Sequence, residues 1–587
     1  MNILVPFMFV AMLVIPTSAT NERPAQPPAW VGRSNENAKL LLAIFSKYNP
    51  ESAGQLGIDG LDDQIIDLKP GIDERARKDV EGAIGLLKER LAAESDPSVK
   101  QDLDILIKSA SDNIRGNDLS LKYEIPFFDI PQVVFSGIRA LLDDQVVPER
   151  RKSALVRLRR YAGMDGDEPI TRLAEDRTRE RLGKPGLLGP VRAQVERAMA
   201  TEPSYIDGIA DLFKKYEVAG YEEAYGKLKS ELAAYDDFVK KEILPKARDD
   251  FRMPEEVYRF SLEQVGIDIP AEELISRAHA AFGEIQGEMQ TLAAQVAREK
   301  GFASANYRDV IKELKKDQLV GDSILPFYRN RIGDIESIIR REHLVTLPER
   351  SVRMRIASPA EASQVPAPNM RPPRLLGNTG EMGEFVLPLN IPAASGEAKA
   401  MKFDDFTFAA ASWTLTAHEA RPGHELQFAS IIEKGVSTAR ALFAFNSTNV
   451  EGWGLYSEAI MKPFMPSDGQ LISLQHRLLR SARAFLDPEL QLGKITKEEA
   501  MKTLREDVVE SEAMATQEVQ RYTFLAPGQA TAYFYGYTRL MELRGDVEKA
   551  LGKKFNQQKF HDFILDQGLL PPHLLRKAVM DNLAAIQ

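Results

Sequence analysis

The chain has 587 residues, of which 44% are hydrophobic and 28% are charged, with a formal net charge of −10 and no cysteine. This composition is ordinary for a globular protein, and the acidic balance argues against a general affinity for nucleic acids or anionic membranes. Without cysteine, the sequence has no disulfide framework, thiol nucleophile, cysteine-linked lipid anchor or cysteine-type zinc site.

The chain begins with an apolar run over residues 2–15. This run is short for a membrane helix, which needs about 20 apolar residues, but it has the length of a signal-peptide core. The small residues Thr17, Ser18 and Ala19 follow, although the N-terminal region lacks Lys and Arg. We predict a signal peptide over 1–19 and an exported protein, periplasmic or secreted, with no membrane span after signal removal.

Residues 36–340 carry apolar side chains at three- and four-residue spacing, which predicts helices almost throughout. Between 344 and 403 the pattern changes. Residues 351–357 alternate with period two, a Pro-rich linker spans 366–373, and residues 383–390 predict a second strand. Pro388 would suit an edge strand, since proline cannot donate to a central ladder. Such an edge strand would pair with the extended backbone of a peptide substrate. The alternative is that the two predicted strands form a plain hairpin that covers the core.

The segment His418-Glu419-Ala-Arg-Pro422-Gly423-His424 is the one place where two histidines and a possible general base lie together. Zinc binds imidazole nitrogens, and an unliganded carboxylate nearby can take a proton from water. Histidines six residues apart lie on nearly opposite sides of a regular helix. We therefore predict that Pro422 and Gly423 break the helix between Arg421 and His424, bringing both imidazoles together. Unrelated histidines near a helix end are the alternative.

A third ligand is expected from a following helix, over residues 439–461. Glu451 and Glu458 are seven residues apart and share one helix face, so one can bind the metal while the other supports it.

These motifs resemble the bacterial domain-of-unknown-function 885 family, which is similar to gluzincin metallopeptidases. The resemblance rests on the His418–Gln427 segment, on Glu451-Gly-Trp453-Gly-Leu-Tyr-Ser-Glu458, and on residues 521–536, and it extends over nearly the whole mature chain. The Glu-Gly-Trp motif is also similar to a gluzincin aminopeptidase segment whose glutamate binds zinc, which favours Glu451 over Glu458. Family members often have a second histidine where this chain has Glu425.

Later residues are candidates for substrate contacts. Tyr533 lies in a Pro-Gly-Gln-Ala-x2-Tyr motif that resembles the family, and a phenol near the metal can donate to an oxyanion. Spacing alone leaves Tyr522, Tyr535 and Tyr537 as rivals and a buried core tyrosine as the alternative. Arginine can hold a substrate carboxylate bidentately or pair with nearby acids on a helix surface; the candidates are Arg521, Arg539 and Arg544.

The predicted class is therefore mainly α: a large helical two-lobed domain with a small β-sheet beside the metal-binding helix, zincin-like. A helical N-terminal lobe would span 20–340 and a metal-binding catalytic lobe 341–587. The predicted function is a Zn2+-dependent hydrolase, acting on a peptide or another amide. His418, His424 and Glu451 would bind zinc, Glu419 and Tyr533 would be catalytic, and Glu458, Arg521 and Tyr522 would support the ligands or contact substrate. A non-peptidase amide or ester hydrolase and a non-catalytic metal-binding protein are the alternatives.

Overall fold

The computed structural model describes residues 28–391 and 401–587, so the predicted signal peptide lies outside the described residues. Within them the fold is mainly helical with a small three-stranded sheet, which confirms the coarse prediction from the sequence. No helix in these two ranges combines the length and apolar character needed to cross a bilayer.

The first part of the chain forms helices of 4 to 27 residues. Helix α4 illustrates the local rules: Pro97 occupies its first turn, and the Asp96 side chain accepts a hydrogen bond from the Ser98 amide at 2.9 Å. The helices are α1 (Ala29–Tyr48), α2 (Pro50–Leu56), α3 (Ile72–Ala93), α4 (Pro97–Tyr123), α5 (Ile130–Arg139), α6 (Pro148–Arg151), α7 (Ser153–Tyr161), α8 (Ile170–Leu182), α9 (Arg192–Lys215) and α10 (Glu222–Phe238).

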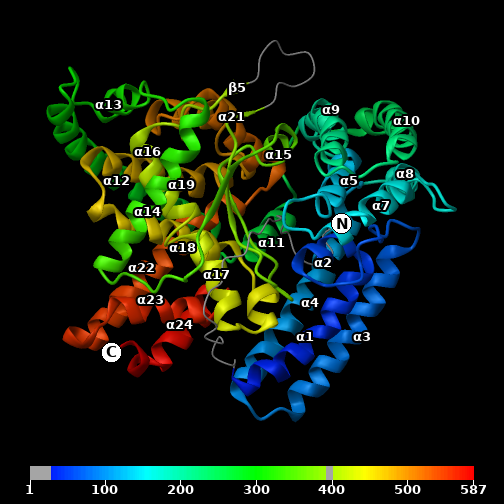
Figure 1. Cartoon of the computed structure of the whole chain (residues 1–587), viewed down its shortest axis with the longest axis horizontal. Helices are drawn as coiled ribbons and strands as arrows, with labels where there is room; N and C mark the ends of the chain where they lie inside the picture. Colours follow the sequence, from blue (N-terminus) through cyan, green and yellow to red (C-terminus); the bar gives the residue numbers. More distant parts are fainter. Residues whose placement is uncertain (1–27, 392–400) are drawn as a thin grey trace.

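The second part of the chain also consists mainly of helices, and two of them, α16 (Ala409–Glu419) and α17 (His424–Lys434), carry the histidine motif. The others are α11 (Glu255–Val265), α12 (Ala271–Lys300), α13 (Tyr307–Leu314), α14 (Ile324–Arg341), α18 (Ser447–Met461), α19 (Ser467–Gln491), α20 (Lys497–Lys502), α21 (Glu512–Gln520), α22 (Ala532–Leu551), α23 (Gln557–Asp566) and α24 (Pro572–Asp581). Figure 1 shows α1–α10 on one side of the molecule and α12, α14, α16, α18, α19 and α22 on the other.

The sheet consists of β1 (Arg353–Ile356), β3 (Glu384–Leu387) and β2 (Asn369–Arg371), in that order, with β1 parallel and β2 antiparallel to β3. Helix α15 (Pro359–Gln364) connects β1 to β2, β2 packs against α17, and β4 (Asn390–Ile391) pairs with β5 (Met401–Lys402). The expectation that Pro388 belongs to an edge strand is wrong. Strand β3 is central and ends before Pro388, and β1 and β2 are the edges. The predicted Pro-rich linker also contains β2.

Three clusters of buried apolar side chains form the interior. The first joins α1–α4 to α17, α18, α23 and α24, the second joins α12–α14 to α16 and α19, and the third fills the space among α5–α10. The first two clusters contain residues from both sides of position 340. The division into lobes at that position stays a prediction.

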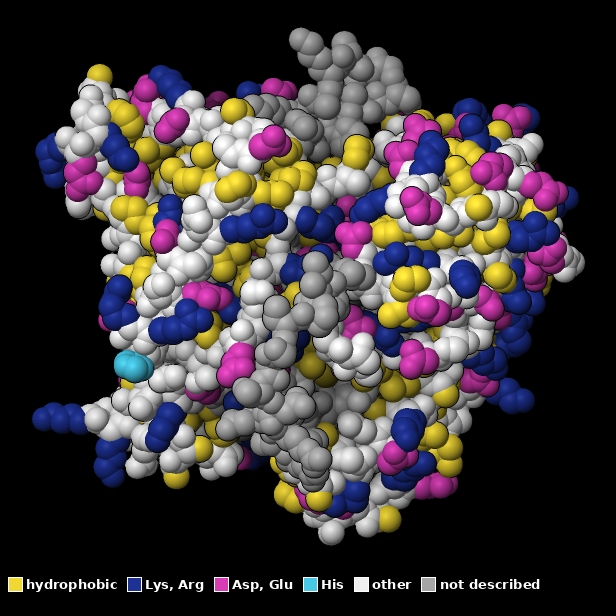
Figure 2. Space-filling model, in the orientation of Figure 1, with side chains coloured by type: hydrophobic (Ala, Val, Ile, Leu, Met, Phe, Trp, Pro, Cys, Tyr) yellow, Lys and Arg dark blue, Asp and Glu magenta, His cyan; other side chains and the backbone are white. Residues whose placement is uncertain are grey.

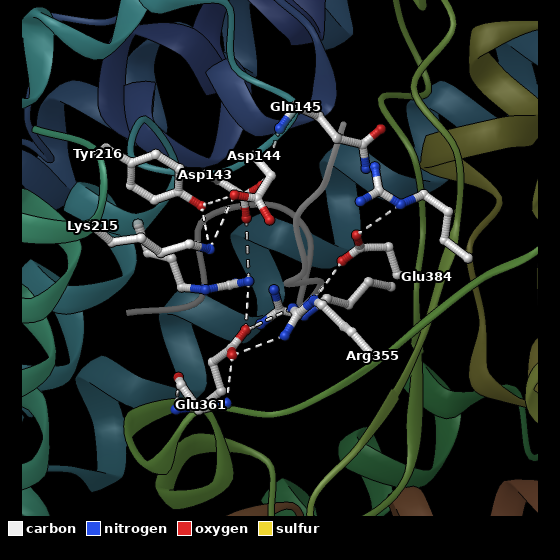
Figure 3. A network of polar contacts seen from close by, with 12 residues as sticks. Asp143, Asp144, Gln145, Lys215, Tyr216, Arg355, Glu361 and Glu384 are labelled. Carbon is white, nitrogen blue, oxygen red and sulfur yellow. Dashed lines mark hydrogen bonds and ion pairs between the residues drawn. The ribbon is translucent and has the colours of Figure 1, made fainter. Parts of the chain in front are cut away.

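A buried ionic network attaches the sheet to the N-terminal helices (Figure 3). Glu361 on α15 accepts hydrogen bonds from both terminal nitrogens of Arg355 on β1, at 2.9 and 2.7 Å. Arg139 from α5 and Arg371 from β2 approach the same carboxylate at 2.5 and 2.9 Å, and Arg355 also donates to Glu384 on β3 at 2.9 Å. The network therefore joins all three strands of the sheet to α5.

On the surface, basic and acidic side chains are interspersed over the face drawn in Figure 2, without one large region of a single sign. This distribution agrees with the composition. The absence of a nucleic-acid partner stays a prediction.

Candidate metal centre

The histidine motif is divided between two helices. Helix α16 ends at Glu419 and α17 begins at His424, with Ala420 outside helical geometry at φ −100° and ψ −99°. The predicted break before His424 is thus confirmed. Gly423 fits because an added Cβ would lie 1.9 Å from the carbonyl oxygen of His418, so only glycine allows the chain to fold back this closely.

The Glu-Gly-Trp motif of α18 holds this connection in place. The indole nitrogen of Trp453, a fully buried side chain, donates a hydrogen bond to the carbonyl oxygen of Pro422 at 2.9 Å. The two motifs that the sequence places about 30 residues apart are therefore joined at the turn, because tryptophan satisfies a backbone oxygen that the helix break leaves free.

The break brings the predicted ligands together. The Nε2 atoms of His418 and His424 are 3.1 Å apart, and Oε2 of Glu451 lies 3.5 Å from the first and 3.3 Å from the second. The ligand atoms of all three residues lie within 4.8 Å of one another. Space for the imidazoles depends on Gly454, where an added Cβ would lie 2.7 Å from His418 Cε1 and 2.9 Å from His424 Cε1.

These residues fit a divalent metal. Two imidazole nitrogens and one carboxylate oxygen are a donor set typical of zinc. Oε2 of Glu451 is buried and accepts no hydrogen bond within the described residues, although buried carboxylate oxygens normally have partners. A cation among the three side chains would satisfy this oxygen.

Glu458 lies behind His418 as a supporting residue. Its Oε1 contacts His418 Nδ1 at 2.7 Å, Thr414 donates its hydroxyl to Oε2, and Arg480 lies 3.6 Å from Oε1. Burial raises the pKa of Glu458, but Arg480 and His418 outweigh burial and lower it to about 2. The ionised carboxylate accepts a hydrogen bond from the Nδ1–H group of His418, which leaves Nε2 directed at the candidate metal position.

Two of the candidate ligands, His418 and Glu451, have strongly shifted pKa values. Burial disfavours a charged His418, but its contacts with Glu451 and Glu458 outweigh this and raise its pKa to about 9. Burial likewise raises the pKa of Glu451, and contacts with the two imidazoles outweigh it and hold that pKa well below the usual value. The carboxylates thus supply negative charge at a place where a cation would bind. Metal binding would displace the imidazolium proton.

Glu419, the candidate base, ends α16 beside His418. It is 7% exposed and makes no hydrogen bond within the described residues. Burial raises its pKa above the usual value, and the two histidines only partly oppose this effect. Glu419 is therefore a carboxylate with free acceptor capacity next to the ligands.

Tyr533 borders the same centre. Its ring lies nearly parallel to that of His418, with centroids 6.1 Å apart, and its hydroxyl oxygen accepts a hydrogen bond from Arg521 Nη2 at 3.0 Å. Arg480 and Arg483 also lie over the Tyr533 ring, at 5.7 and 4.5 Å from its centroid.

The other predicted contact residues are placed differently. Tyr522 donates its hydroxyl to Glu518 at 2.7 Å, and Tyr535 donates to Asp268. Arg539 pairs with Glu542 at 2.9 Å. Arg544 pairs with Glu548 and donates to Tyr456. Glu425 accepts a hydrogen bond from Arg421 at 2.8 Å. Of the predicted contact residues, Tyr533 borders the candidate centre, and Arg521 is connected to it through its hydrogen bond to Tyr533.

Several polar residues of the site were missed in the sequence. Arg480 and Arg483 lie three residues apart on α19, a spacing that places both side chains on one helix face and was the signal that could have found them. Thr414 precedes His418 by four residues and therefore shares its face of α16. Glu518 accepts two hydrogen bonds from Arg483, at 2.7 and 2.6 Å. No sequence motif identifies Glu518 as a residue of the site.

Comparison with known proteins places the chain in a family. Two solved structures share its fold: a "putative lipoprotein of unknown function" from Shewanella oneidensis and a "putative lipoprotein" from Colwellia psychrerythraea. The first has 19% identity, a TM-score of 0.68, and coverage of 94% of this chain and 100% of that one. The second has 18% identity, a TM-score of 0.72, and coverage of 94% and 99%. No curated protein matches the chain. The family described as "Bacterial protein of unknown function (DUF885)" matches residues 50–579, and the chain belongs to this family.

Proposed function

We propose that this protein is a zinc-dependent peptidase. The observation that carries the proposal is the convergence of His418, His424 and Glu451 from three helices, with a buried, unbonded Glu419 beside them. A chance grouping of surface residues would lack the hydrogen bond from His418 Nδ1 to Glu458 that orients one imidazole.

The number of ligands favours a catalytic metal over a structural one. The candidate group has three members within the part of the chain that the structure describes. Structural zinc sites use four protein ligands, whereas catalytic sites keep one position open for water or substrate. A bound zinc ion would lower the pKa of a water molecule and polarise a carbonyl group.

The proton is handled by Glu419. This carboxylate takes a proton from the attacking water and later gives it to the nitrogen of the leaving amine. A pKa raised by burial suits both steps, because the group must hold the proton between them.

Tyr533 stabilises the oxyanion that forms at the scissile carbonyl. Arginine has donors but no acceptor, so its contact with Tyr533 uses the phenol oxygen and leaves the phenol proton free to be donated.

The likeness to gluzincin peptidases, the two-lobed organisation and the export of the protein belong to the same proposal. The motif likeness to gluzincin peptidases implies a zincin-like, two-lobed catalytic domain. The apolar run at residues 2–15 supports export. The two structurally similar proteins, each called a putative lipoprotein, support it too.

The test is cleavage of a mixed peptide library by zinc-loaded protein, with and without a chelator, analysed by mass spectrometry. Cleavage that the chelator abolishes and added zinc restores is the expected result. Parallel amide and ester substrates without peptide character separate a peptidase from a more general hydrolase. Zinc-loaded protein that cleaves nothing in any of these sets would contradict catalysis.

A further inference from the structure

The arginine group around Tyr533 contains one guanidinium that differs from the other two. Arg483 is 5% exposed and forms a bidentate pair with Glu518, and Arg480 is 8% exposed and lies next to Glu458. The side chain of Arg521 is 18% exposed. Arg521 is therefore the member of the group that solvent, and hence a substrate, can best reach.

The hydrogen-bonding capacity of Arg521 is only partly used. Its Nη2 donates to the Tyr533 hydroxyl and to the side-chain oxygen of Gln529. Its Nη1 lies 3.7 Å from Glu518, beyond hydrogen-bond distance, and this carboxylate already accepts from Arg483 and Tyr522. Nε and Nη1 of Arg521 make no hydrogen bond within the described residues.

The position of Arg521 links it to the candidate metal centre. Its guanidinium carbon is 5.1 Å from the centroid of the Tyr533 ring, and that ring is 6.1 Å from the His418 ring. An arginine with free donors recognises carboxylates through paired, charge-assisted hydrogen bonds. Surface arginines such as Arg539 instead form an ion pair with a nearby acid. The distance between Arg539 and Glu542 is 2.9 Å.

We propose that Arg521 binds a carboxylate of the peptide substrate beside the candidate metal centre. This inference rests on the proposed peptidase function and specifies its substrate class: peptides that carry a negative charge close to the scissile bond. The carboxylate has two possible sources, the free C-terminus of the peptide or an acidic side chain.

The experiment measures binding of N-acetylated peptide pools to zinc-loaded Glu419→Gln protein by calorimetry, where turnover does not interfere. One pool has free C-termini, a second has the same sequences amidated, and a third is amidated and enriched in Glu and Asp. A pool that presents the preferred carboxylate should bind roughly 10–100-fold more tightly than the neutral amidated pool, as expected for charge-assisted hydrogen bonds. Preference for the first or the third pool identifies the source.

Second substitutions test the residue itself. In the Glu419→Gln background, Arg521→Gln should abolish the difference between pools, Arg521→Lys should retain part of it, and Arg539→Gln, on the exposed side of α22, should leave it unchanged. If Arg521 only orients the phenol, Arg521→Gln and Tyr533→Phe should each lower turnover equally for every pool in the active protein and leave the binding preference intact. That result would overturn the inference.

The two proposals fail differently. Equal binding of charged and neutral pools with continued zinc-dependent cleavage removes the role of Arg521 and leaves the peptidase standing. Absence of both binding and cleavage for all pools removes the peptidase function, and the inference with it.

Discussion

Glu419 and Glu458 are both buried carboxylates near His418, but their surroundings suit them to different proposed roles. Glu458 has three polar partners and a pKa of about 2, so it stays ionised and orients the imidazole. Glu419 has no hydrogen-bond partner within the described residues, and burial raises its pKa. Environment, rather than residue type, separates a supporting acid from a candidate base.

The substitution Glu419→Gln tests the base. Glutamine keeps the size of the side chain but lacks a basic oxygen, so folding and zinc content should survive while turnover falls by ~10²–10⁴-fold. Elemental analysis and peptide cleavage rates, at matched protein concentration, provide the two measurements. Loss of zinc would show that Glu419 is a metal ligand. Retention of both zinc and turnover rate would assign the general-base role to another residue, and Glu425 would be the first to examine.

Replacement of the acids on α18 tests the ligands. Glu451→Ala should lose zinc, as should His418→Ala and His424→Ala, because each removes a direct donor. Glu458→Ala should weaken zinc affinity or activity by only ~10–100-fold, the usual effect of a supporting residue. Zinc titrations are the measurement, with exposed Glu542→Ala as the control. Full zinc retention in Glu451→Ala would transfer the ligand role elsewhere.

At the scale of elements, the site depends on close approach of helices. Gly454 leaves room for the two imidazoles, and Gly452, two residues earlier, allows α18 to pack directly against Gly536 of α22, where an added Cβ would lie 2.6 Å from that backbone. The alternating glycines of the Glu-Gly-Trp-Gly motif thus serve two different contacts of one helix.

Gly454→Ala should therefore disturb the metal centre. The added methyl group would overlap both histidine rings, so zinc affinity should fall, and overpacking of this kind costs roughly 1–3 kcal/mol of stability. Gly545→Ala on α22 is the matched control, because an added Cβ there would meet nothing within 4 Å and alanine favours a helix. Zinc titration and thermal unfolding of both variants are the measurements. Unchanged zinc affinity in Gly454→Ala would contradict the close contact between Gly454 and the two imidazole rings.

At the scale of the whole molecule, the candidate ligands join different parts of the core. His418 lies on α16, which contributes residues to both the first and the second apolar cluster, whereas α17 and α18 contribute to the first. A metal held by these helices would add a link beside α16, which already packs in both clusters.

Zinc should consequently stabilise the folded chain. At a free concentration 100 times the dissociation constant, a ligand that binds only the folded state adds about 2.7 kcal/mol to the free energy of unfolding. Urea unfolding with zinc and with a chelator should show this difference for the wild type and none for His424→Ala. An equal effect of zinc on both proteins would point to binding elsewhere.

The network at Glu361 predicts sensitivity to acid. Burial raises the pKa of this carboxyl, but Arg139 and Arg355 outweigh burial and lower it to about 2. A lowered pKa in the folded state means that the stabilisation is complete above the unfolded value near 4.5 and is lost as the pH falls toward 2. Removing one member of a buried ion pair typically costs about 3–5 kcal/mol.

Glu361→Gln should therefore destabilise metal-free protein at pH 7, and its difference from the wild type should shrink as the pH falls below about 4.5. Urea midpoints across this range provide the measurement. Exposed Glu542→Gln is the control, and a difference that stays constant with pH would contradict the ionised state of Glu361.

The sequence by itself determined the helical class, because apolar residues at helical spacing must be buried on one face. It also determined the ligand candidates and the helix break, since His418 and His424 at six-residue spacing can meet only across a break. The family followed from motifs that are local in the chain.

Tertiary structure alone decided the rest. The order of strands depends on pairing between distant segments, so Pro388 lies after a central strand and not on an edge. The resemblance favours Glu451 over Glu458 as the ligand, but only the packing shows which imidazole atom each acid meets. Arg480, Arg483 and Glu518 join the site from two further helices. No local pattern records these contacts, because they exist only where helices far apart in the chain pack together.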